Sequence, residues 1–174
     1  DIVENALYKG LEKHQAHHGT AIVLDVKTGH IKAIANLTKA NDAYAERFNY
    51  AIGEGYEPGS TFKIMSMMAL IEDGYVDLDD SIDTELGETN FYGRKMLDSE
   101  KGEHSLMSFK EVIEKSSNVG TSKLINRYYK KQPRKFLTHI KNAQLMNKTG
   151  VQIKGEASPT FYSPDNTTWS LTTL

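Results

Sequence analysis

An apolar run at residues 64–71 is the strongest feature of the hydrophobic pattern along this chain. Pro58 and Gly59 stand before it and Asp73-Gly74 follows it, and residues of these types interrupt or end helices. The pattern therefore predicts a loop that passes into a helix near residue 60. Because apolar side chains surround this segment instead of following one stripe, we expect the helix to be central and buried on all sides.

The N-terminal part of the chain predicts one helix and two strands. Apolar residues at helical spacing predict an amphipathic helix over residues 1–18, with Gly19 as its stop. Residues 20–26 and 30–36 are rich in Ile, Val and Ala, which is typical of strands. Lys27-Thr28-Gly29 is expected to join them as a hairpin turn.

Helices return after an acidic, irregular stretch at 76–105, which indicates surface connections with short strands and no chemistry of its own. Ser108 and Glu111 fit a capping box, which predicts a helix start. That helix should end at 116–118, and a second should begin near Val119. A further helix should open at Pro133 and turn inward Phe136, Leu137, Ile140 and Leu145, and Trp169 should be a packing anchor in the loop that follows.

A serine and a lysine lie at the predicted start of the central helix. Ser60 and Lys63 are three residues apart, so they share a helix face and their side chains can come within hydrogen-bond reach. Among apolar neighbours a lysine loses hydration and its pKa falls, so that the neutral amine can take the serine proton. The backbone N–H groups of the first turn also suit a developing oxyanion. The alternative is a capping serine and a lysine whose head reaches water, and these two residues alone favour it.

A second motif, Ser116-Ser117-Asn118, lies between two predicted helices. An ordinary turn would explain it, because serine and asparagine favour helix caps. Ser-x-x-Lys followed by Ser-x-Asn, however, is a grouping of penicillin-binding proteins and related β-lactamases. The segments at 20–35, 49–52, 56–60 and 148–156 resemble this family too, and the motifs come in its order. The chain thus resembles the transpeptidase domain of a class B penicillin-binding protein over nearly its whole length.

The resemblance implies a fold and roles for four residues. The fold would be α+β, of the β-lactamase and transpeptidase type. Residues 1–174 would form a partial transpeptidase domain, a helical subdomain with part of an antiparallel sheet, whose later strands lie outside this sequence. Ser60 would attack the penultimate D-Ala carbonyl of a peptidoglycan stem peptide, and Lys63 would take its proton. Ser116 would relay a proton between Lys63 and the leaving group, and Asn118 would hydrogen-bond the substrate backbone.

The resemblance also implies a cellular setting. The parent protein would be anchored in the cytoplasmic membrane with its catalytic domain on the periplasmic or extracytoplasmic side. It would cross-link stem peptides during cell-wall synthesis, with the cell-division branch favoured over the elongation branch. Its partners would be stem peptides, β-lactam antibiotics and division or elongation proteins. No metal or organic cofactor is implied.

The family's third motif, Lys-Thr-Gly, occurs twice in this sequence. Lys27-Thr28-Gly29 precedes Ser60 and is expected to be the hairpin turn. Lys148-Thr149-Gly150 follows a helical stretch, whereas the family's working triplet lies on a sheet strand much later in the chain. We therefore expect neither triplet to line the site, and the working strand to lie beyond Leu174. That strand would carry a carboxylate-binding lysine and threonine and one backbone N–H of the oxyanion hole.

The composition bears on which partners, disulfides, membrane helices and metal sites the chain could have. With 21 basic and 23 acidic residues in 174, the chain gives no sign of a nucleic-acid partner. The absence of cysteine excludes disulfides and thiol chemistry. No apolar run approaches the roughly 20 residues of a membrane helix. His14, His17 and His18 have spacings that could hold a metal, but a solvated helix end explains them.

Two other functional classes stay open. A serine β-lactamase or β-lactam sensor would share Ser60 and Lys63, although no deacylating carboxylate can be assigned from the sequence. A truncated, non-catalytic interaction domain would leave Ser60 without any role in acylation.

Overall fold

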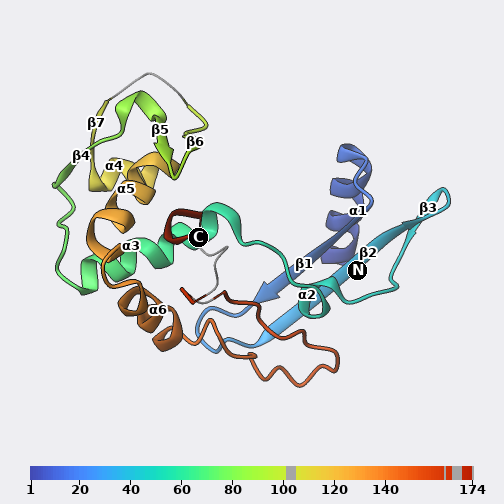
Figure 1. Cartoon of the computed structure of the whole chain (residues 1–174). Coiled ribbons are helices and arrows are strands. Elements are labelled where there is room, and N and C mark those ends of the chain that lie inside the picture. Colours follow the sequence, from blue (N-terminus) through green and yellow to red (C-terminus); the bar gives the residue numbers. More distant parts are fainter. Residues whose placement is uncertain (101–104, 163, 166–169, 174) are drawn as a thin grey trace. The chain divides into compact units, whose positions relative to one another are not determined.

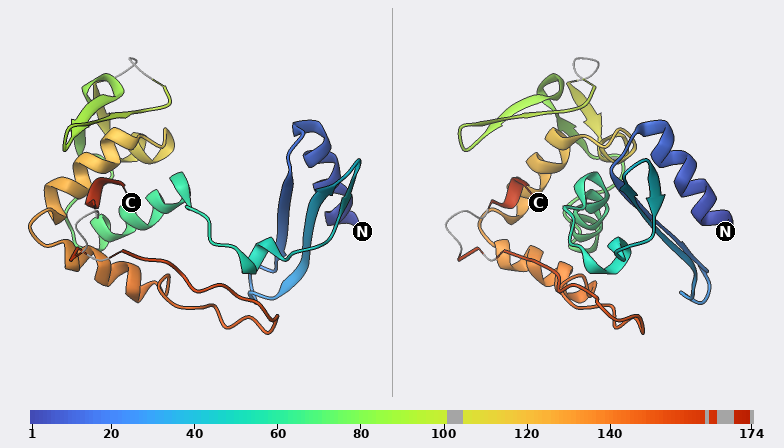
Figure 2. Two further views of the ribbon diagram at one scale, coloured as in Figure 1. Left: turned by 45° about the vertical axis from the view of Figure 1, so that its right-hand side comes forward. Right: turned by 90° about the vertical axis from the view of Figure 1, so that its right-hand side faces the viewer.

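The structure, a computed structural model, describes residues 1–100, 105–162, 164–165 and 170–173. It divides into two compact units, one formed by 1–56 with 147–160 and the other by 57–146 with 161–174. Figure 1 shows the elements of both units in chain order, and Figure 2 shows the same ribbon from two further sides. The interpretation of residues 1–174 as one partial domain stays a prediction.

The first unit is an antiparallel sheet with a helix packed on it. The helix α1 spans Ile2–His14, and the strands are β1 (His18–Leu24), β2 (Ile31–Ala40) and β3 (Ala43–Ala45), in the order β1-β2-β3. Ala21 pairs with Ala35 in the β1–β2 register. The buried side chain of Leu11 on α1 contributes to the core of this unit together with Ala35 and Leu37 of β2. A short helix, α2 (Tyr50–Gly53), follows the sheet.

The expected extent of the first helix is wrong at its C-terminal end. The helix stops at Gln15, whose φ of 50° places it in the left-handed region, and not at Gly19. The hydroxyl of Tyr44 in β3 donates to the carbonyl oxygens of Leu11 and Ala16, at 3.2 and 2.6 Å. These bonds satisfy carbonyl groups at the end of the helix and let the chain enter β1 early.

The hairpin between β1 and β2 confirms the expected turn. One carboxylate oxygen of Asp25 accepts the backbone N–H groups of Lys27 and Thr28, each at 3.0 Å. These hydrogen bonds, with those of Thr28 the strongest, lower the pKa of Asp25 below its ordinary value. Gly29 closes the turn with a φ of 69°, a conformation in which glycine meets no steric penalty.

The second unit packs three helices around the central one. The chain enters it through a 3₁₀ turn, η1 (Gly59–Phe62), and continues as α3 (Lys63–Glu72). The other helices are α4 (Phe109–Glu114), α5 (Asn118–Tyr129) and α6 (Pro133–Asn142), and a 3₁₀ turn, η3 (Leu171–Thr173), packs on α5. Two small antiparallel pairs complete the unit, β4 (Ser81–Asp83) with β7 (Leu106–Ser108) and β5 (Glu88–Phe91) with β6 (Arg94–Leu97), and a 3₁₀ turn, η2 (Glu85–Gly87), precedes β5.

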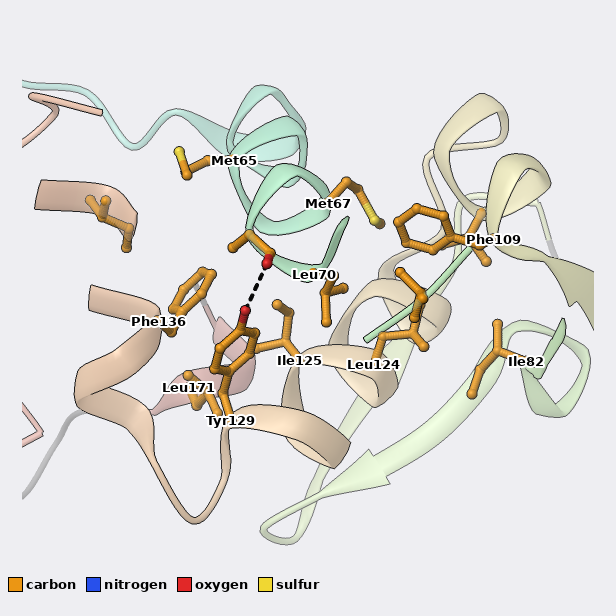
Figure 3. Packing of buried hydrophobic residues seen from close by; sticks show 14 of the residues in the cluster. Met65, Met67, Leu70, Ile82, Phe109, Leu124, Ile125, Tyr129, Phe136 and Leu171 are labelled. Carbon is orange, nitrogen blue, oxygen red and sulfur yellow. Dashed lines mark hydrogen bonds between the residues drawn. The ribbon is translucent and has the colours of Figure 1, made fainter. Parts of the chain in front are cut away.

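The core of this unit lies where α3, α4, α5 and α6 meet. Figure 3 shows Met65 and Met67 of α3 facing apolar side chains of the other helices, with Ile82 of β4 and Leu171 of η3 at the margins. The buried hydroxyl of Tyr129 lies 2.9 Å from the carbonyl oxygen of Ala69, the bond drawn in Figure 3. Buried polar groups are hydrogen-bonded in stable cores, and this bond ties α5 to α3.

A second bond of the same hydroxyl leads to a charged cluster at the end of α3. The carboxylate of Asp73 accepts the Tyr129 hydroxyl at 2.6 Å and lies 2.9 Å from the amine of Lys135 and 3.0 Å from a ring nitrogen of His139. Burial alone would raise the pKa of Asp73, but the hydrogen bonds from these three residues lower it. The cluster therefore holds α3, α5 and α6 together through a charged carboxylate.

The expectation that the central helix is buried on all sides is wrong. Ile64, Met68 and Ile71 are 62, 55 and 49% exposed. Their spacing of four and three residues places them on one face, and α4, α5 and α6 cover the opposite one. Only half of the helix surface is buried because the other three helices all pack from the same side.

The remaining helices largely follow the sequence. Ser108 and Glu111 form the predicted capping box: the Ser108 hydroxyl accepts the Glu111 N–H, and the Glu111 carboxylate accepts the Ser108 N–H. Pro133 is the first residue of α6, as expected. The inward placement of Leu145 is wrong, since α6 ends at Asn142 and Leu145 is 44% exposed. Trp169, the expected packing anchor, lies outside the described residues. Helices and antiparallel strands occur together, as the expected α+β class requires.

Candidate active site

Ser60 lies at the end of a sharply turned entry into the central helix. Gly59 has a φ of 57°, a left-handed conformation that glycine adopts without penalty, and Ser60 follows it within η1. The Ser60 side chain is exposed. Within the described residues, this hydroxyl makes no hydrogen bond.

Lys63 begins α3, and its backbone N–H donates to the carbonyl oxygen of Ser60. A 3₁₀ turn has three residues, so the side chains of Ser60 and Lys63 project in the same direction. Their side chains are not hydrogen-bonded to each other in the described structure. The Lys63 amine donates instead to Ser116, at 2.5 Å to its carbonyl oxygen and 3.1 Å to its hydroxyl. The structure thus joins the two predicted motifs through Lys63 and Ser116.

The environment of Lys63 favours loss of its proton. Its side chain is half-buried, and burial lowers the pKa of the amine below its ordinary value. The negative charge of Asp98 acts in the opposite direction and offsets part of this effect. The two oxygens of Ser116 that Lys63 contacts are uncharged. An amine in this environment can act as a base closer to neutral pH than a solvated lysine can.

Ser116 owes its position to the way α4 ends. The Ser117 N–H donates to the carbonyl oxygen of Val112 at 3.0 Å, and the Ser116 N–H donates to that of Ile113 at 3.1 Å. This pair of bonds is the Schellman motif, in which the residue at the position of Ser116 adopts the left-handed conformation and is usually glycine. Ser116 has a φ of 52°. Its hydroxyl is therefore held on a tight turn that exposes it toward Lys63.

The helix α5 begins immediately after this turn. The Ser117 hydroxyl caps it by accepting the Gly120 N–H at 2.8 Å. Asn118 is the first residue of α5, and its side-chain amide donates to the carbonyl oxygen of Leu97 at 2.7 Å. Its amide oxygen is an acceptor that a substrate N–H could use. Asn118 is thus fixed by the β5–β6 hairpin.

Gly120 lets α5 approach α4 closely at the Ser-x-Asn turn that joins the two helices. A Cβ atom at this position would lie 2.7 and 2.9 Å from the two methyl carbons of Val112. Any larger residue would therefore force the two helices apart at the point where the Ser-x-Asn turn joins them.

Asp98 is a site residue that the sequence analysis missed. It follows β6, in the stretch that was expected to carry no chemistry, and it is 8% exposed. Its two carboxylate oxygens accept the Ser117 hydroxyl at 2.7 Å and the Val119 N–H at 2.9 Å. No motif marks this residue, and only the fold brings it to the Ser-x-Asn turn.

The second Lys-Thr-Gly triplet is bound within its own loop. The carboxylate of Glu156 accepts the N–H and hydroxyl groups of Thr149, at 2.5 and 2.8 Å, and the Gly150 N–H at 3.2 Å. The Lys148 amine donates to the carbonyl oxygen of Glu156 at 2.7 Å. The triplet lies on no strand. Its lysine and threonine are therefore engaged with Glu156 in a closed loop of the first unit.

The described residues contain no group of three or more side chains that could hold a metal ion, so His14, His17 and His18 do not form one. His18 instead stacks on Tyr50, with ring centroids 4.3 Å apart. In the same residues, no helix is both long enough and apolar enough to cross a membrane.

The site brings together Ser60, the half-buried amine of Lys63 and the hydroxyl of Ser116. The model of the penicillin binding protein transpeptidase domain matches residues 19–171. The chain belongs to this family. The resemblance stated from the sequence is therefore confirmed, and so is the fold class.

Individual relatives within the family match most of the chain. It is 34% identical over 132 residues to the probable peptidoglycan D,D-transpeptidase PenA of Neisseria gonorrhoeae, a match that covers 70% of this chain and 21% of PenA. It is 32% identical over 152 residues to the penicillin-binding protein PbpB of Mycobacterium tuberculosis, covering 82% of this chain and 22% of PbpB. The chain thus spans about a fifth of the length of these relatives.

Solved structures show the same fold. The crystal structure of penicillin-binding protein 3 from Mycobacterium tuberculosis in its apo form superimposes with a TM-score of 0.80 at 30% identity, covering 99% of this chain and 39% of that one. The structure of the same protein complexed with ampicillin gives a TM-score of 0.80 at 29% identity, covering 99% and 38%.

Proposed function

We propose that the protein is a peptidoglycan D,D-transpeptidase that works through a serine acyl-enzyme. The observation that carries this proposal is the half-buried amine of Lys63, which donates hydrogen bonds to both oxygens of Ser116. Lys63 lies three residues after Ser60, whose side chain is exposed. Membership of the transpeptidase family supports it. So do the relatives that match this chain, which include proteins named peptidoglycan D,D-transpeptidases.

The first half of the reaction forms the acyl-enzyme. The Ser60 hydroxyl oxygen attacks the penultimate D-Ala carbonyl carbon of a stem peptide as Lys63 accepts the hydroxyl proton. The C–N bond to the terminal D-Ala then breaks, and the leaving amine takes a proton that Ser116 relays from Lys63. A serine ester on Ser60 and free D-Ala result. The contact of 3.1 Å between the Lys63 amine and the Ser116 hydroxyl provides the path for this proton.

The second half transfers the acyl group. An amine of a neighbouring stem peptide attacks the ester carbonyl, loses a proton to the base and releases Ser60, which leaves the two peptides joined by an amide bond. The side-chain amide of Asn118 orients the donor peptide backbone. The amide already donates to Leu97, so its oxygen is the group available to accept a substrate N–H.

The substrates and setting follow from this chemistry. The donors and acceptors are stem peptides of the cell wall, and the working side is the extracytoplasmic face of the cytoplasmic membrane. β-Lactams acylate Ser60 in place of the D-Ala-D-Ala end, as the ampicillin complex of the related Mycobacterium tuberculosis protein suggests. Proteins of the division or elongation machinery are the proposed partners, with division favoured.

The test is the intact mass of the protein after incubation with benzylpenicillin. We expect one covalent adduct on the native protein and none on Ser60→Ala. Lys63→Ala should lose most of the adduct, and Lys148→Ala should form it at the native rate because Lys148 is bound in its own loop. An adduct that persists on Ser60→Ala would refute the assignment of the nucleophile. Rapid loss of the adduct with release of hydrolysed drug would indicate a β-lactamase instead, and absence of any adduct would indicate a non-catalytic interaction domain.

A further inference from the structure

The buried carboxylate of Asp98 has no step in the chemistry proposed above, yet it holds the Ser-x-Asn turn at two points. It accepts the Ser117 hydroxyl at 2.7 Å and the Val119 N–H at 2.9 Å. These two residues flank Asn118 in the chain, and Ser117 also follows Ser116 directly. The carboxylate therefore fixes the backbone on both sides of Asn118, with hydrogen bonds of the charge-assisted kind that are stronger than neutral ones.

The β5–β6 hairpin fixes Asp98 in turn. The Asp98 N–H donates to the carbonyl oxygen of Gly87 at 2.8 Å, and the neighbouring Leu97 carbonyl accepts the Asn118 amide at 2.7 Å. Gly87 has a φ of 79°, and a Cβ atom there would lie 3.2 Å from the Asp98 Cβ. Asp98 is thus enclosed by its own hairpin on one side and by the start of α5 on the other.

The same carboxylate acts electrostatically on Lys63. Burial disfavours the protonated form of the Lys63 amine, and the negative charge of Asp98 favours it. The direct contacts of the amine, both to Ser116, are with uncharged oxygens. The Asp98 side chain therefore hydrogen-bonds the Ser-x-Asn turn, and its charge acts on the Lys63 amine.

We propose that Asp98 is a positioning residue whose carboxylate fixes Ser116 and Asn118 by holding the backbone on both sides of Asn118. The proposal rests on the proposed function of this site. The hydrogen bonds and the charge of Asp98 can be tested separately, because a hydrogen-bonding anchor can be lost without loss of charge and the charge can be removed with little change in shape.

The decisive variant is Asp98→Asn. Asparagine has the same size, its amide oxygen can accept the Val119 N–H, and its NH₂ group can donate to Ser117. Removing the charge removes an interaction that stabilises the ammonium form of Lys63, so the amine should lose its proton at lower pH than in the native protein. Ser117→Ala is the complementary variant, because it removes one anchor of the turn, together with the cap of α5, and leaves the charge of Asp98 in place.

The state of Lys63 can be read without catalysis. Only the neutral amine reacts with 1-fluoro-2,4-dinitrobenzene, so the pH dependence of Lys63 arylation, followed by peptide mass spectrometry, gives its titration midpoint. We expect a lower midpoint in Asp98→Asn and an unchanged one in Ser117→Ala. The acid limb of benzylpenicillin acylation should move with the midpoint in Asp98→Asn. Ser117→Ala should acylate about 10-fold more slowly at every pH, as the loss of a hydrogen bond to a charged group implies.

Asp80→Asn is the matched control, since this carboxylate also accepts a backbone N–H, from Asp77 at 2.9 Å, but does not act on Lys63. Its midpoint and acylation rate should equal the native values. Asp98→Ser serves as a second uncharged variant if Asp98→Asn does not fold. Acylation at the native rate in both Ser117→Ala and Asp98→Ser would overturn the proposal, because these variants remove the hydrogen bonds by which Asp98 holds the turn. A lowered midpoint in a protein that benzylpenicillin does not acylate would support the coupling and refute the proposed function instead.

Discussion

Ser116 occupies a backbone position that normally belongs to glycine, and the cost of keeping a side chain there can be measured. It is the left-handed residue of the Schellman motif that ends α4, with a φ of 52°. Residues with a Cβ atom are disfavoured in this conformation. Replacing Ser116 by glycine should therefore relieve strain, whereas replacing it by alanine should not. Both changes remove the hydroxyl that Lys63 contacts, so the comparison isolates the backbone.

The expected difference follows from two opposing effects. A left-handed residue with a Cβ atom costs about 1–2 kcal/mol relative to glycine. Glycine, however, gives the unfolded chain more freedom, which offsets about 0.4–1 kcal/mol. The Gly variant should thus be more stable than the Ala variant by about 0.5–1 kcal/mol. Lys63 keeps its bond of 2.5 Å to the carbonyl oxygen of residue 116 in both variants, so this contact does not alter the comparison.

Urea unfolding followed by circular dichroism measures this difference, with equal m-values as the check that both variants unfold alike. Benzylpenicillin acylation of the same samples should fall in both variants, because neither has the hydroxyl. An Ala variant as stable as the Gly variant would refute the argument that Ser116 is strained. Acylation at the native rate in the Gly variant would refute the role of the hydroxyl, whatever the stabilities.

Three further changes test the packing that supports the site. Tyr129→Phe should lower the free energy of unfolding by about 1–3 kcal/mol in urea, because the Ala69 carbonyl and the Asp73 carboxylate each lose the hydrogen bond from this hydroxyl; no measurable loss would contradict this. The pKa of Asp73 is lowered, so its stabilising contribution is present above the ordinary value of 3.8 and is lost as the pH falls through the folded-state pKa. Asp73→Asn should therefore be less stable than the native protein at pH 7 and approach it in acid; a gap that does not change with pH would argue against this. Gly120→Ala should destabilise by about 1–3 kcal/mol by clashing with Val112, and Val112→Ala should restore part of the loss in a double-mutant cycle, whereas additive losses would exclude the clash.

The sequence predicted local structure where the signal is local. The capping box at Ser108 and the Pro133 helix start were confirmed, because each depends on side chains within one turn of the helix it opens. The β1–β2 hairpin was confirmed for the same reason, since Asp25 and Gly29 act within the turn itself.

Features that depend on distant partners were missed or wrong. The burial of the central helix was misjudged because composition gives the number of apolar residues on α3 and not the side from which its neighbours pack, so Ile64 and Met68 are exposed. The end of α1 was placed too late because the Tyr44 hydroxyl, which caps it, comes from another element.

The site shows the same division. The spacing of Ser60 and Lys63 and the Ser-x-Asn turn were visible in the sequence, and their roles stay predictions. Residue spacing alone could not show the partner of the Lys63 amine, because Ser116 is 53 residues away; the family resemblance implied it. Asp98 was not visible either, since a carboxylate in a polar hairpin looks solvated until the fold brings Ser117 and Val119 to it.

The loop that Glu156 closes has a consequence for how motifs are transferred between proteins. The sequence contains Ser-x-x-Lys, Ser-x-Asn and Lys-Thr-Gly in the family's order, so a search by sequence motif alone would find all three. The third triplet is not available for recognition, because Glu156 already binds its threonine and its lysine. Engineering that grafts or swaps Lys-Thr-Gly by alignment would therefore alter the closure of a surface loop here. A motif can be transferred between proteins only where its side chains are not already hydrogen-bonded to other parts of the same chain.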